Sequence, residues 1–257
     1  MTDETDRPAL NARPSLISII VPIYNEGGNV VKLVEHLQRL EGFHEAILVD
    51  ASDQPDSRAM VTNALRALPK SLLSSPTSNA SKIGLVASTE SGRAAQMNLG
   101  AKSADGDILL FLHCDTRLPD DAMKLIRRVI ENGYGWGRFD ISLESKGLIY
   151  RVIERMVNLR SRVRRIGTGD QAMFIAASLF HECGGYPRIA LMEDIAICKK
   201  LNRHSLPGLI KKAVVTSARR WHNKGALATI LLMWKLRLLF WIGVDSNRLA
   251  RMYDDDE

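Results

Sequence analysis

Short apolar runs alternate with amphipathic stretches along the first half of the chain. Residues 107–112 are apolar after the first position, which is typical of a strand covered on both faces, as in a parallel sheet. Between the runs, apolar residues recur every three or four positions, as on the buried side of a helix. The predicted strands span residues 16–23, 46–49, 83–87 and 107–112, and the predicted helices span residues 30–40, 57–68 and 93–102. This alternation predicts an α/β fold with a mostly parallel sheet flanked by helices.

The second half of the chain has longer helices and more widely spaced strands. The predicted strands cover residues 136–143, 172–176 and 209–216, and the predicted helices cover residues 148–166, 193–203 and 226–244. The Ser-rich residues 69–81 of the first half, in contrast, predict a surface loop. We find no internal repeat that would indicate a solenoid or a propeller.

Two of these helices have features that bear on a membrane. In residues 148–166 the positions expected to face inward are Ile149, Val152, Ile153, Met156 and Val163. The remaining face is rich in arginine, which suits either solvation or contact with phosphate and acidic lipid headgroups. Residues 226–244 are apolar nearly all round, although Lys235 and Arg237 in mid-segment argue against insertion. For this segment a helix packed on the domain, an interfacial membrane helix and a membrane span all remain open.

The composition is that of an ordinary soluble globular protein, with 46% hydrophobic and 25% charged residues in 257. The formal net charge of +6 favours anionic partners such as nucleotides, phosphates or an acidic membrane surface, and we expect no nucleic-acid partner. Three cysteines without C-x-x-C spacing argue for reduced thiols in the cytosol, and against disulfides or a zinc site. The polar residues 1–14 predict a disordered tail and are not a secretory signal.

Polar side chains follow several of the predicted strands. Asn25 and Glu26 follow the first strand, Asp50 the second and Asp115 the fourth, so in a parallel sheet they share one edge. His113 and Asp115 together offer nitrogen and oxygen ligands to one divalent ion. The alternative is that Asp115 merely caps the helix after Pro119. No G-x-G-x-x-G or Walker lysine loop follows the first strand, which disfavours dinucleotide and P-loop sites.

Three further positions suggest chemistry on an anionic substrate. Gly92-Arg93 begins a helix and could present backbone amides and a guanidinium to a diphosphate. Glu193-Asp194 lies in the first turn of another helix, where the helix dipole is expected to lower both pKa values and keep the acids ionised. An ionised carboxylate there could act as a general base toward an attacking hydroxyl. Arg220-Trp221 could bind a phosphate and stack on a ring.

With these residues in place, the chain resembles the family-2 glycosyltransferases of GT-A fold over nearly all of residues 16–221. The resemblance rests on residues 21–26, 48–50, 92–98, 110–116, 167–174 and 192–194. Residues 136–140, 169–171 and 191–194 are most similar to a bacterial subgroup found beside radical-SAM enzymes and named for arsenosugar biosynthesis. One departure is that the first acid of the family's D-x-D motif is His113 here, which leaves one carboxylate for the ion.

The resemblance implies a role for each matching residue. Asp194 would be the general base with Glu193 as its neighbour, and Asp115 with His113 would hold Mn or Mg. The residues that would bind the nucleotide-sugar are Pro22, Tyr24, Asn25, Glu26, Asp50, Gly92, Arg93, Asn98, Asp170, Arg220 and Trp221. The Gln of the longer Arg-Trp motif in processive synthases is not apparent, which disfavours a polymerising enzyme. A nucleotide-binding half over residues 15–117 and an acceptor half over 118–222 would precede a C-terminal helix and acidic tail over 223–257.

The implied activity is an inverting, metal-dependent transfer of a sugar from a nucleotide diphosphate to an acceptor hydroxyl. A UDP-sugar is the default donor, because Asp50 could accept a hydrogen bond from a uracil N–H. A small metabolite and a lipid phosphate both remain open as acceptors. The alternatives are a sugar-phosphate nucleotidyltransferase and a non-catalytic, nucleotide-binding, membrane-associated protein. The expected location is the cytoplasm, with contact at the inner face of the membrane through 148–166 and 226–244 left open.

Overall fold

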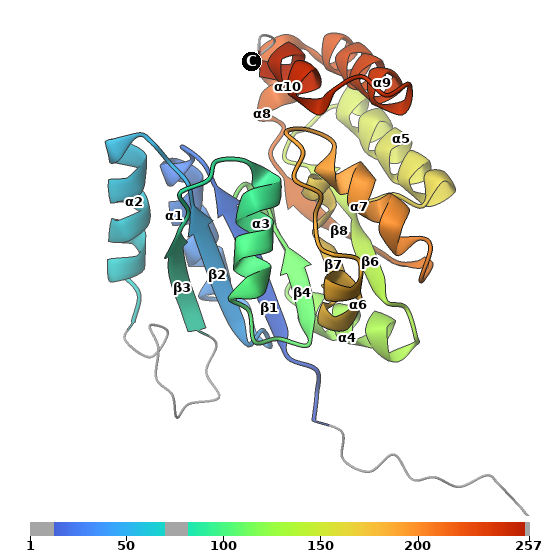
Figure 1. Ribbon diagram of the computed structural model, residues 1–257. Helices are drawn as coiled ribbons and strands as arrows, with labels where there is room; N and C mark the ends of the chain where they lie inside the picture. The colour runs from blue at the N-terminus through green and yellow to red at the C-terminus, as the bar shows by residue number, and fades with distance from the viewer. Residues whose placement is uncertain (1–12, 70–81, 255–257) are drawn as a thin grey trace, which may run out of the picture.

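A computed structural model describes residues 13–69 and 82–254, which form an eight-stranded mixed sheet with helices on both faces (Figure 1). The strand order is β3-β2-β1-β4-β7-β6-β8-β5. Most of the predicted tail 1–14, the loop 69–81 and the final acidic residues lie outside the described residues. The strands are β1 (Ile17–Ile23), β2 (Glu45–Asp50), β3 (Lys82–Ala87), β4 (Ile108–Phe111), β5 (Thr116–Arg117), β6 (Trp136–Leu143), β7 (Met173–Ala176) and β8 (Pro207–Thr216).

The helices connect these strands and cover the sheet, as the α/β pattern of the sequence predicted. They are α1 (Gly27–Leu37), α2 (Pro55–Arg66), α3 (Arg93–Lys102), α4 (Ala122–Glu131), α5 (Leu148–Arg164), η2 (Gly169–Gln171), α6 (Ala177–Glu182), α7 (Glu193–Leu201), α8 (Arg219–Lys224), α9 (Ala226–Trp241) and α10 (Ser246–Asp254). Of these, η2, α6, α8 and α10 are helices that the sequence pattern did not predict.

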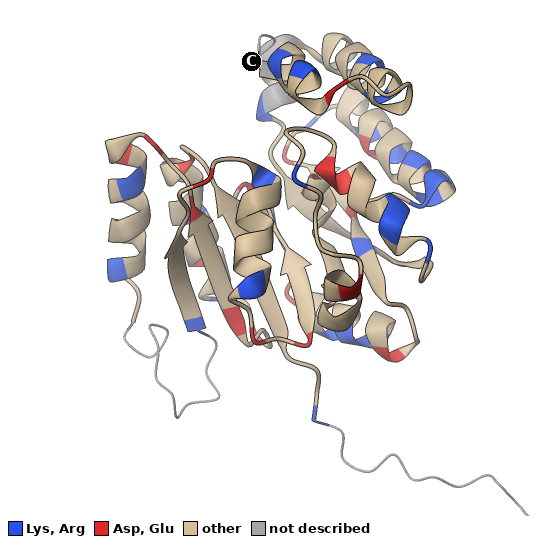
Figure 2. Cartoon of the chain, viewed as in Figure 1, with Lys and Arg blue, Asp and Glu red and all other residues tan. Residues whose placement is uncertain are grey.

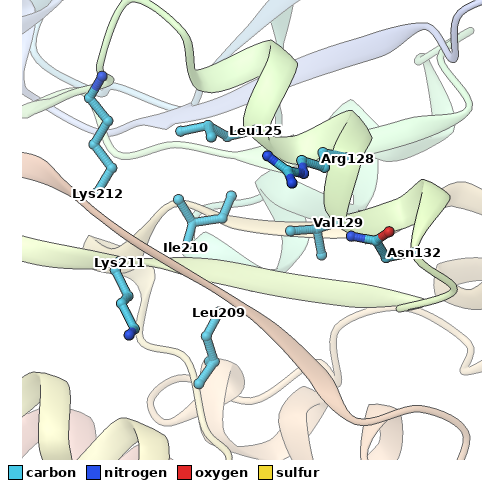
Figure 3. A pocket seen from close by; sticks show the side chains of 8 residues that line it. All are labelled: Leu125, Arg128, Val129, Asn132, Leu209, Ile210, Lys211 and Lys212. Atoms are coloured by element: carbon cyan, nitrogen blue, oxygen red, sulfur yellow. The ribbon is translucent and has the colours of Figure 1, made fainter.

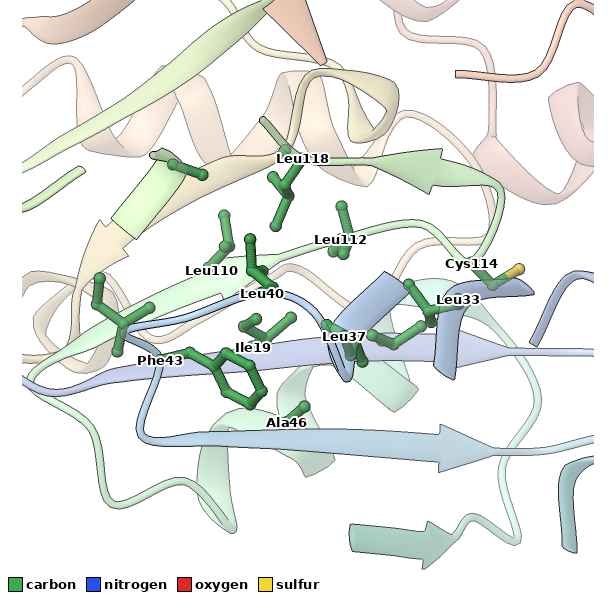
Figure 4. Close-up of a cluster of buried hydrophobic side chains, with 14 of the residues drawn as sticks. Ile19, Leu33, Leu37, Leu40, Phe43, Ala46, Leu110, Leu112, Cys114 and Leu118 are labelled. Carbon is green, nitrogen blue, oxygen red and sulfur yellow. The ribbon is translucent and has the colours of Figure 1, made fainter. Parts of the chain in front are cut away.

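The parallel half of the sheet buries alternate residues of each strand on opposite faces. Ile19 and Leu110 point into the cluster formed with α1, α2 and α4, part of which Figure 4 shows. Ile20 and Phe111, the next residues along the same strands, point into the cluster with α3, α6 and α7. Because successive side chains of a strand alternate between faces, each run of consecutive apolar residues serves two cores. Burying each of these large side chains contributes about 1.5–3 kcal/mol.

The other half of the sheet joins by antiparallel pairing. β7 runs antiparallel to β4, with Phe111 opposite Met173, so the residues before β7 lie beside those after β4. β6 is antiparallel to β7 and parallel to β8, which places Leu143 opposite Thr216. The carboxyl ends of β1, β2, β4, β6 and β8 and the amino end of β7 therefore share one edge of the sheet. We call this edge the carboxyl edge.

The orientation of α5 differs from the sequence prediction. Ile153 faces inward as expected, whereas Ile149, Val152, Met156 and Val163 are exposed. The inward face of α5 is instead polar, because it bonds to the sheet and to η2. Glu154 accepts a hydrogen bond from the Leu143 amide (2.6 Å), Asn158 bonds both backbone groups of Ile141 (2.9 and 3.1 Å), and Ser161 donates to Gln171 (3.0 Å). This face turns inward because it supplies hydrogen-bond partners to backbone groups of β6 and to the buried side chain of Gln171.

The C-terminal helices α8, α9 and α10 lie beyond the carboxyl edge, near the end of α5 (Figure 1). α9 and α10 pack on the loop before α7 through Met192, Leu236 and Leu249. α9 also contacts α5 and α8, because Ile230 packs against the cluster that contains Ile153. Among the residues that the structure describes, no helix combines the length and the apolar character needed to cross a bilayer.

Candidate active site

Residues after β1 and β2 form a hydrogen-bonded pair of loops at the carboxyl edge. The amide of Asn25 donates to Asp53 (2.7 Å), and the Tyr24 hydroxyl donates to the other oxygen of the same carboxylate (3.0 Å). The backbone N–H of Asn25 donates to the Ser52 hydroxyl (2.9 Å). Asp50 ends β2 and accepts a bond from the Ser52 amide (2.9 Å). The tie through Asp53, which the sequence analysis missed, leaves the ring of Tyr24 exposed at the edge.

Pro22 occurs in a central strand without breaking the sheet. Ile23 bonds toward β2 through Ala51, and Ile20 bonds toward β4 through Leu112, so the nitrogen of Pro22 faces β4 beyond its last paired residue. No ladder hydrogen bond is lost there, which is the condition under which proline is tolerated in a sheet. On the other side of β1, the side-chain amide of Gln96 in α3 links β1 to β2. It donates to the carbonyls of Ile23 (2.6 Å) and Val49 (2.8 Å).

Asp115 lies among other acids at the carboxyl edge. Burial raises its pKa, the carboxylates of Glu26 and Asp170 raise it further, and Thr116 and Arg219 act in the opposite direction. Glu26 accepts a hydrogen bond from the Cys114 thiol (3.1 Å) and lies 4.0 Å from the guanidinium of Arg219. Residues after β1, β4 and β8 and before β7 thus meet around Asp115. Like charges held close together favour a cation between them.

The capping alternative for Asp115 is not what the structure has. The residue that precedes α4 is Asp121, six positions further along, and Asp115 accepts a long hydrogen bond from its neighbour Thr116 (3.4 Å). His113 packs against Gly169, where an added Cβ would lie 2.2 Å from its Nε2 atom. Burial and the charge of Arg93 lower the pKa of His113 to about 3, so its ring is neutral at pH 7.

Glu193 and Asp194 begin α7 and are held against η2. Asp194 accepts hydrogen bonds from the backbone amides of Ile195 (2.7 Å) and Gly169 (3.3 Å). Burial, then the charge of Asp194, raises the pKa of Glu193 to about 7, with Arg93 opposing. Burial also raises the pKa of Asp194, against the effect of its two amide bonds and of Arg237. The prediction that the helix dipole would lower both pKa values was therefore wrong, because burial outweighs it.

One acid lies within electrostatic range of both the Asp115 region and the start of α7. Asp170, in η2, acts electrostatically on both Asp115 and Asp194. Its neighbour Thr168 donates a short hydrogen bond to its carboxylate, which holds the side chain in place. Asp115 and Asp194, 79 positions apart in the sequence, therefore lie on the same edge of the molecule.

Two arginines near these acids were not predicted as site residues. Arg160 of α5 and Arg237 of α9 each bury an Nε atom that has no hydrogen-bond partner within the described part of the chain. Burial, then Arg237, lowers the pKa of Arg160 to about 10, whereas Asp170 and Asp194 act in the opposite direction. Arg160 was one of many arginines on its helix and carried no distinguishing signal. Arg237 did carry one, because a cation inside an apolar segment usually has a buried partner or a function.

The remaining predicted residues take varied positions. The side-chain amide of Asn98 donates to the carbonyl of Tyr186 (2.8 Å) and accepts from the N–H of the same residue (2.9 Å). These bonds connect α3 to the turn before α7. Arg93, at the start of α3, is exposed and follows Gly92, whose φ is +113°. Trp221 packs on the cluster around Ile153, and the side chain of Arg220 lies outside the described residues.

Left-handed backbone conformations gather around the same edge. Asn25 (φ 54°), Ala172 (φ 45°) and Met192 (φ 68°) adopt them without being glycine. Asn25 and Met192 directly precede the predicted site residues Glu26 and Glu193, and Ala172 follows the η2 turn that contains Asp170. The other described non-glycine residue with positive φ, Arg165, is the C-terminal cap of α5. Such conformations cost about 1–3 kcal/mol each and concentrate at functional sites, where the surrounding structure holds them.

The side-chain oxygen and nitrogen atoms around Asp115 suit a divalent ion whose coordination shell is completed by a bound substrate. No group of three or more His, Cys, Asp or Glu side chains in residues 13–69 and 82–254 is arranged to hold a metal ion by itself. Mg and similar ions are often held by one or two carboxylates, with substrate phosphates as the other ligands. Asp115 among its neighbouring acids fits that mode, and the neutral ring of His113 is in the protonation state that a ligand needs.

The family model for glycosyl transferase family 2 matches residues 18–193. This span begins at the second residue of β1 and includes the Asp115 region, η2 and Glu193. The chain belongs to glycosyl transferase family 2. Its fold is the GT-A fold that the sequence analysis expected.

Two relatives of this family member are undecaprenyl-phosphate 4-deoxy-4-formamido-L-arabinose transferases. The one from Proteus mirabilis (strain HI4320) is 25% identical over 122 residues, which cover 46% of this chain and 34% of the relative. The one from Yersinia pestis (strain Pestoides F) is 23% identical over 178 residues, covering 67% and 51%. The matched part thus spans about half or less of the length of these relatives.

Solved structures of the same fold include two with bound donors. S. aureus TarS 1–349 in complex with UDP-GlcNAc superposes with a TM-score of 0.58 at 15% identity, covering 79% of this chain and 58% of TarS. The mannosyltransferase PcManGT from Pyrobaculum calidifontis, in complex with GDP-Man and Mn2+, gives a TM-score of 0.55 at 17% identity, covering 85% and 65%. At this level of identity the likeness concerns the fold alone.

A separate surface pocket lies between α4 and β8 (Figure 3). Leu125, Val129 and Leu209 are among its lining residues, together with the basic Arg128 and Lys211. The β8 residues come from the middle of that strand, whereas the carboxyl edge begins where β8 ends. None of the predicted site residues lines this pocket.

Proposed function

We propose that this glycosyltransferase moves a sugar from a nucleotide diphosphate to an acceptor hydroxyl, with inversion and with a divalent ion. The observation that carries the proposal is that Asp170 acts electrostatically on both Asp115 and Asp194, so the three acids lie along a single edge. One of these acids is suited to an ion and another to the acceptor. A general base must lie apart from the leaving group, on the opposite side of the sugar, for inversion to occur.

The loops after β1 and β2 are proposed to hold the nucleoside. The exposed ring of Tyr24 can stack on a base, because every base has a π face. Asp50 at the end of β2 can accept a hydrogen bond from a uracil N–H, so a UDP-sugar is the proposed donor. Asp53 orients this part of the site through its bonds to Tyr24 and Asn25.

Asp115 with His113 would hold the divalent ion, Mn or Mg, and the start of α3 would face the diphosphate. The ion, when bound, supplies positive charge to the leaving diphosphate. Arg93 adds a cation on the same side, since its charge reaches both His113 and Glu193. Preorganised charges of this kind are worth several kcal/mol to the transition state.

Asp194 is proposed to take the proton from the acceptor hydroxyl. Its two backbone hydrogen bonds favour the ionised carboxylate that a base needs, whereas burial and the charge of Asp194 raise the pKa of Glu193 to about 7. Glu193 is thus a positioning residue that sets the charge next to the base. Proton transfer by a positioned base contributes about 10²–10⁴-fold to a rate.

A second candidate acceptor is a phosphate oxygen, as in a polyprenyl phosphate. The unpartnered Nε atoms of Arg160 and Arg237 favour it, because a buried guanidinium N–H without a hydrogen-bond partner is costly. A phosphate close to both would satisfy them by charge-assisted hydrogen bonds. The names of the two relatives, which are undecaprenyl-phosphate transferases, agree with this candidate. The nucleotidyltransferase and scaffold alternatives are set aside because the family is one of glycosyltransferases.

Membership in the bacterial subgroup beside radical-SAM enzymes stays a prediction. Its three motifs do contact one another in this chain. The Gln171 amide donates to the carbonyl of Phe139 (3.4 Å), and the amide of Gly169 donates to Asp194 (3.3 Å). A cytoplasmic location, at the inner face of a membrane, likewise stays a prediction.

The test is a panel of UDP- and GDP-sugars incubated with the full chain, with Mn, with Mg and with excess chelator. We expect slow donor hydrolysis with one sugar nucleotide, dependent on the ion, and transfer when an acceptor alcohol or polyprenyl phosphate is added. The product anomer, determined by proton NMR, should be inverted relative to the donor. Full activity in chelator would contradict the metal proposal, and a retained anomer would contradict the role of Asp194.

A further inference from the structure

The outward face of α5 is an unbroken apolar stripe. Its members recur every three or four residues, so they line one side of the helix. They are Leu148, Ile149, Val152, Met156, Leu159 and Val163, and the exposed fraction reaches 86% for Leu148 and 72% for Val163. A surface helix normally turns such a stripe toward the core. In α5 the polar bonds of Glu154, Asn158 and Ser161 hold the opposite face inward, so the stripe is left in water.

The neighbouring helix α9 has a second stripe of the same kind. Its inward side packs on Met192 and Leu249, whereas its outer side exposes Leu231, Trp234, Leu238 and Trp241, followed by Ile242. Trp241 is 76% exposed. Single exposed apolar residues are normal, but rows of them on two adjacent helices indicate a surface that is covered by something apolar.

The charge around both stripes is positive. α5 carries five arginines and one glutamate, and that glutamate is paired with Arg151 at 2.8 Å. α9 carries Lys235 and Arg237 and no acid. Arg155, Arg164 and Lys235 are exposed beside the stripes, and Figure 2 shows basic residues along α5. Apolar side chains flanked by arginine and lysine, with tryptophan among them, match the boundary between headgroups and acyl chains.

We propose that α5 and α9 dock this protein onto an anionic lipid bilayer. The stripes enter the boundary between headgroups and acyl chains, and the flanking cations bind lipid phosphates. Charge complementarity selects this occupant, because a second copy of the chain would bring the same positive charge to the surface. The proposal stands apart from the proposed function, since docking needs neither donor nor acceptor. It would also bring a lipid phosphate acceptor close to the proposed site, because Arg160 and Arg237 lie on these same two helices.

The test is flotation of the full chain with vesicles of phosphatidylcholine that contain about 30% phosphatidylglycerol, in the absence of any substrate. We expect the protein to float with these vesicles, and the partition coefficient to fall about tenfold or more in pure phosphatidylcholine or at high salt. The double variant Leu159→Asp/Val163→Asp should lose about tenfold or more, and so should Trp234→Asp/Trp241→Asp, because each removes two inserted side chains.

The matched control is Leu206→Asp, which makes the same chemical change at a half-exposed leucine of the loop before β8. It should float like the unchanged protein. Circular dichroism and thermal unfolding check that every variant is folded, which is expected because the changed side chains already face solvent. Absence of flotation, equal flotation with neutral vesicles, or stripe variants that float normally would each overturn the proposal. A stable dimer in light scattering that the stripe variants convert to monomers would also overturn it, in favour of a second copy.

Discussion

Replacing Glu193 by glutamine should change how the stability of the protein depends on pH. Glu193 is only 6% exposed at the start of α7, and burial and Asp194 raise its pKa to about 7 from an ordinary value of 4.5. The folded protein therefore holds this proton to a higher pH than the unfolded chain does. The free energy of unfolding should fall as the pH rises from about 4.5 to about 7, and this part of the stability is fully present below that range.

The size of the effect follows from the same pKa. A pKa near 7 in place of 4.5 corresponds to about 3 kcal/mol against the charged carboxylate in the folded state. Because Asp194 shares in the titration, we expect about 1–3 kcal/mol to be lost between pH 5 and pH 8. Glutamine is uncharged and of similar shape, so the variant Glu193→Gln should not show this loss. At pH 8 it should be more stable than the unchanged protein by a similar amount.

The assay is urea unfolding followed by tryptophan fluorescence at several pH values, with linear extrapolation to water. Glu35→Gln is the matched control, because Glu35 is an exposed residue of α1. Its stability should follow that of the unchanged protein at every pH. Parallel stability curves for Glu193→Gln and the unchanged protein would refute the reasoning, because they would mean that Glu193 titrates alike in both states.

Three other changes test separate parts of the structure. Asn98→Ala removes two hydrogen bonds to the Tyr186 backbone and should cost about 1–3 kcal/mol, visible as a lower Tm; an unchanged Tm would contradict this. Gly169→Ala would place a Cβ 2.2 Å from His113 and should lower turnover about tenfold or more, whereas Gly84→Ala, with nothing within 4 Å, should not. Asp115→Asn should weaken donor binding in calorimetry and abolish its enhancement by Mn; enhancement equal to that of the unchanged protein would argue against Asp115 as a ligand.

The parallel half of the fold was predictable because its information is local. Runs such as residues 16–23 contain enough apolar side chains to fill both faces of a sheet, and the structure buries them on two sides. Polar residues directly after these strands had to share an edge once the strands were parallel. Asn25, Asp50 and Asp115 therefore lie on the edge that the sequence predicted.

The antiparallel half depended on contacts between distant segments. No local pattern specifies that β7 pairs with β4, or that β6 lies between β7 and β8. The pairing of β7 with β4 is nevertheless what brings Asp170 beside Asp115. Asp53, Gln96 and Arg219 were missed for the same reason, because each acquires its role from a partner in another loop or strand.

Two predictions were wrong because another interaction outweighed the general rule on which each was based. The rule that the apolar face of a helix turns inward failed for α5, where Glu154 and Asn158 satisfy backbone groups of β6. The rule that a helix start lowers the pKa of acids failed for Glu193 and Asp194, because segments distant in sequence bury them. Both failures concern the side of the molecule where we propose the acceptor and the membrane surface to lie.

The role of Asp194 as the base is tested most directly by comparing donor binding with sugar transfer in Asp194→Asn. The asparagine can keep the hydrogen bond from Ile195, so the site should stay folded and donor affinity should change by less than about threefold. Transfer to an acceptor hydroxyl should fall by about 10²–10⁴-fold. If transfer continued at the rate of the unchanged protein while the donor bound normally, Asp194 would not be the base, and the proposed mechanism would be wrong.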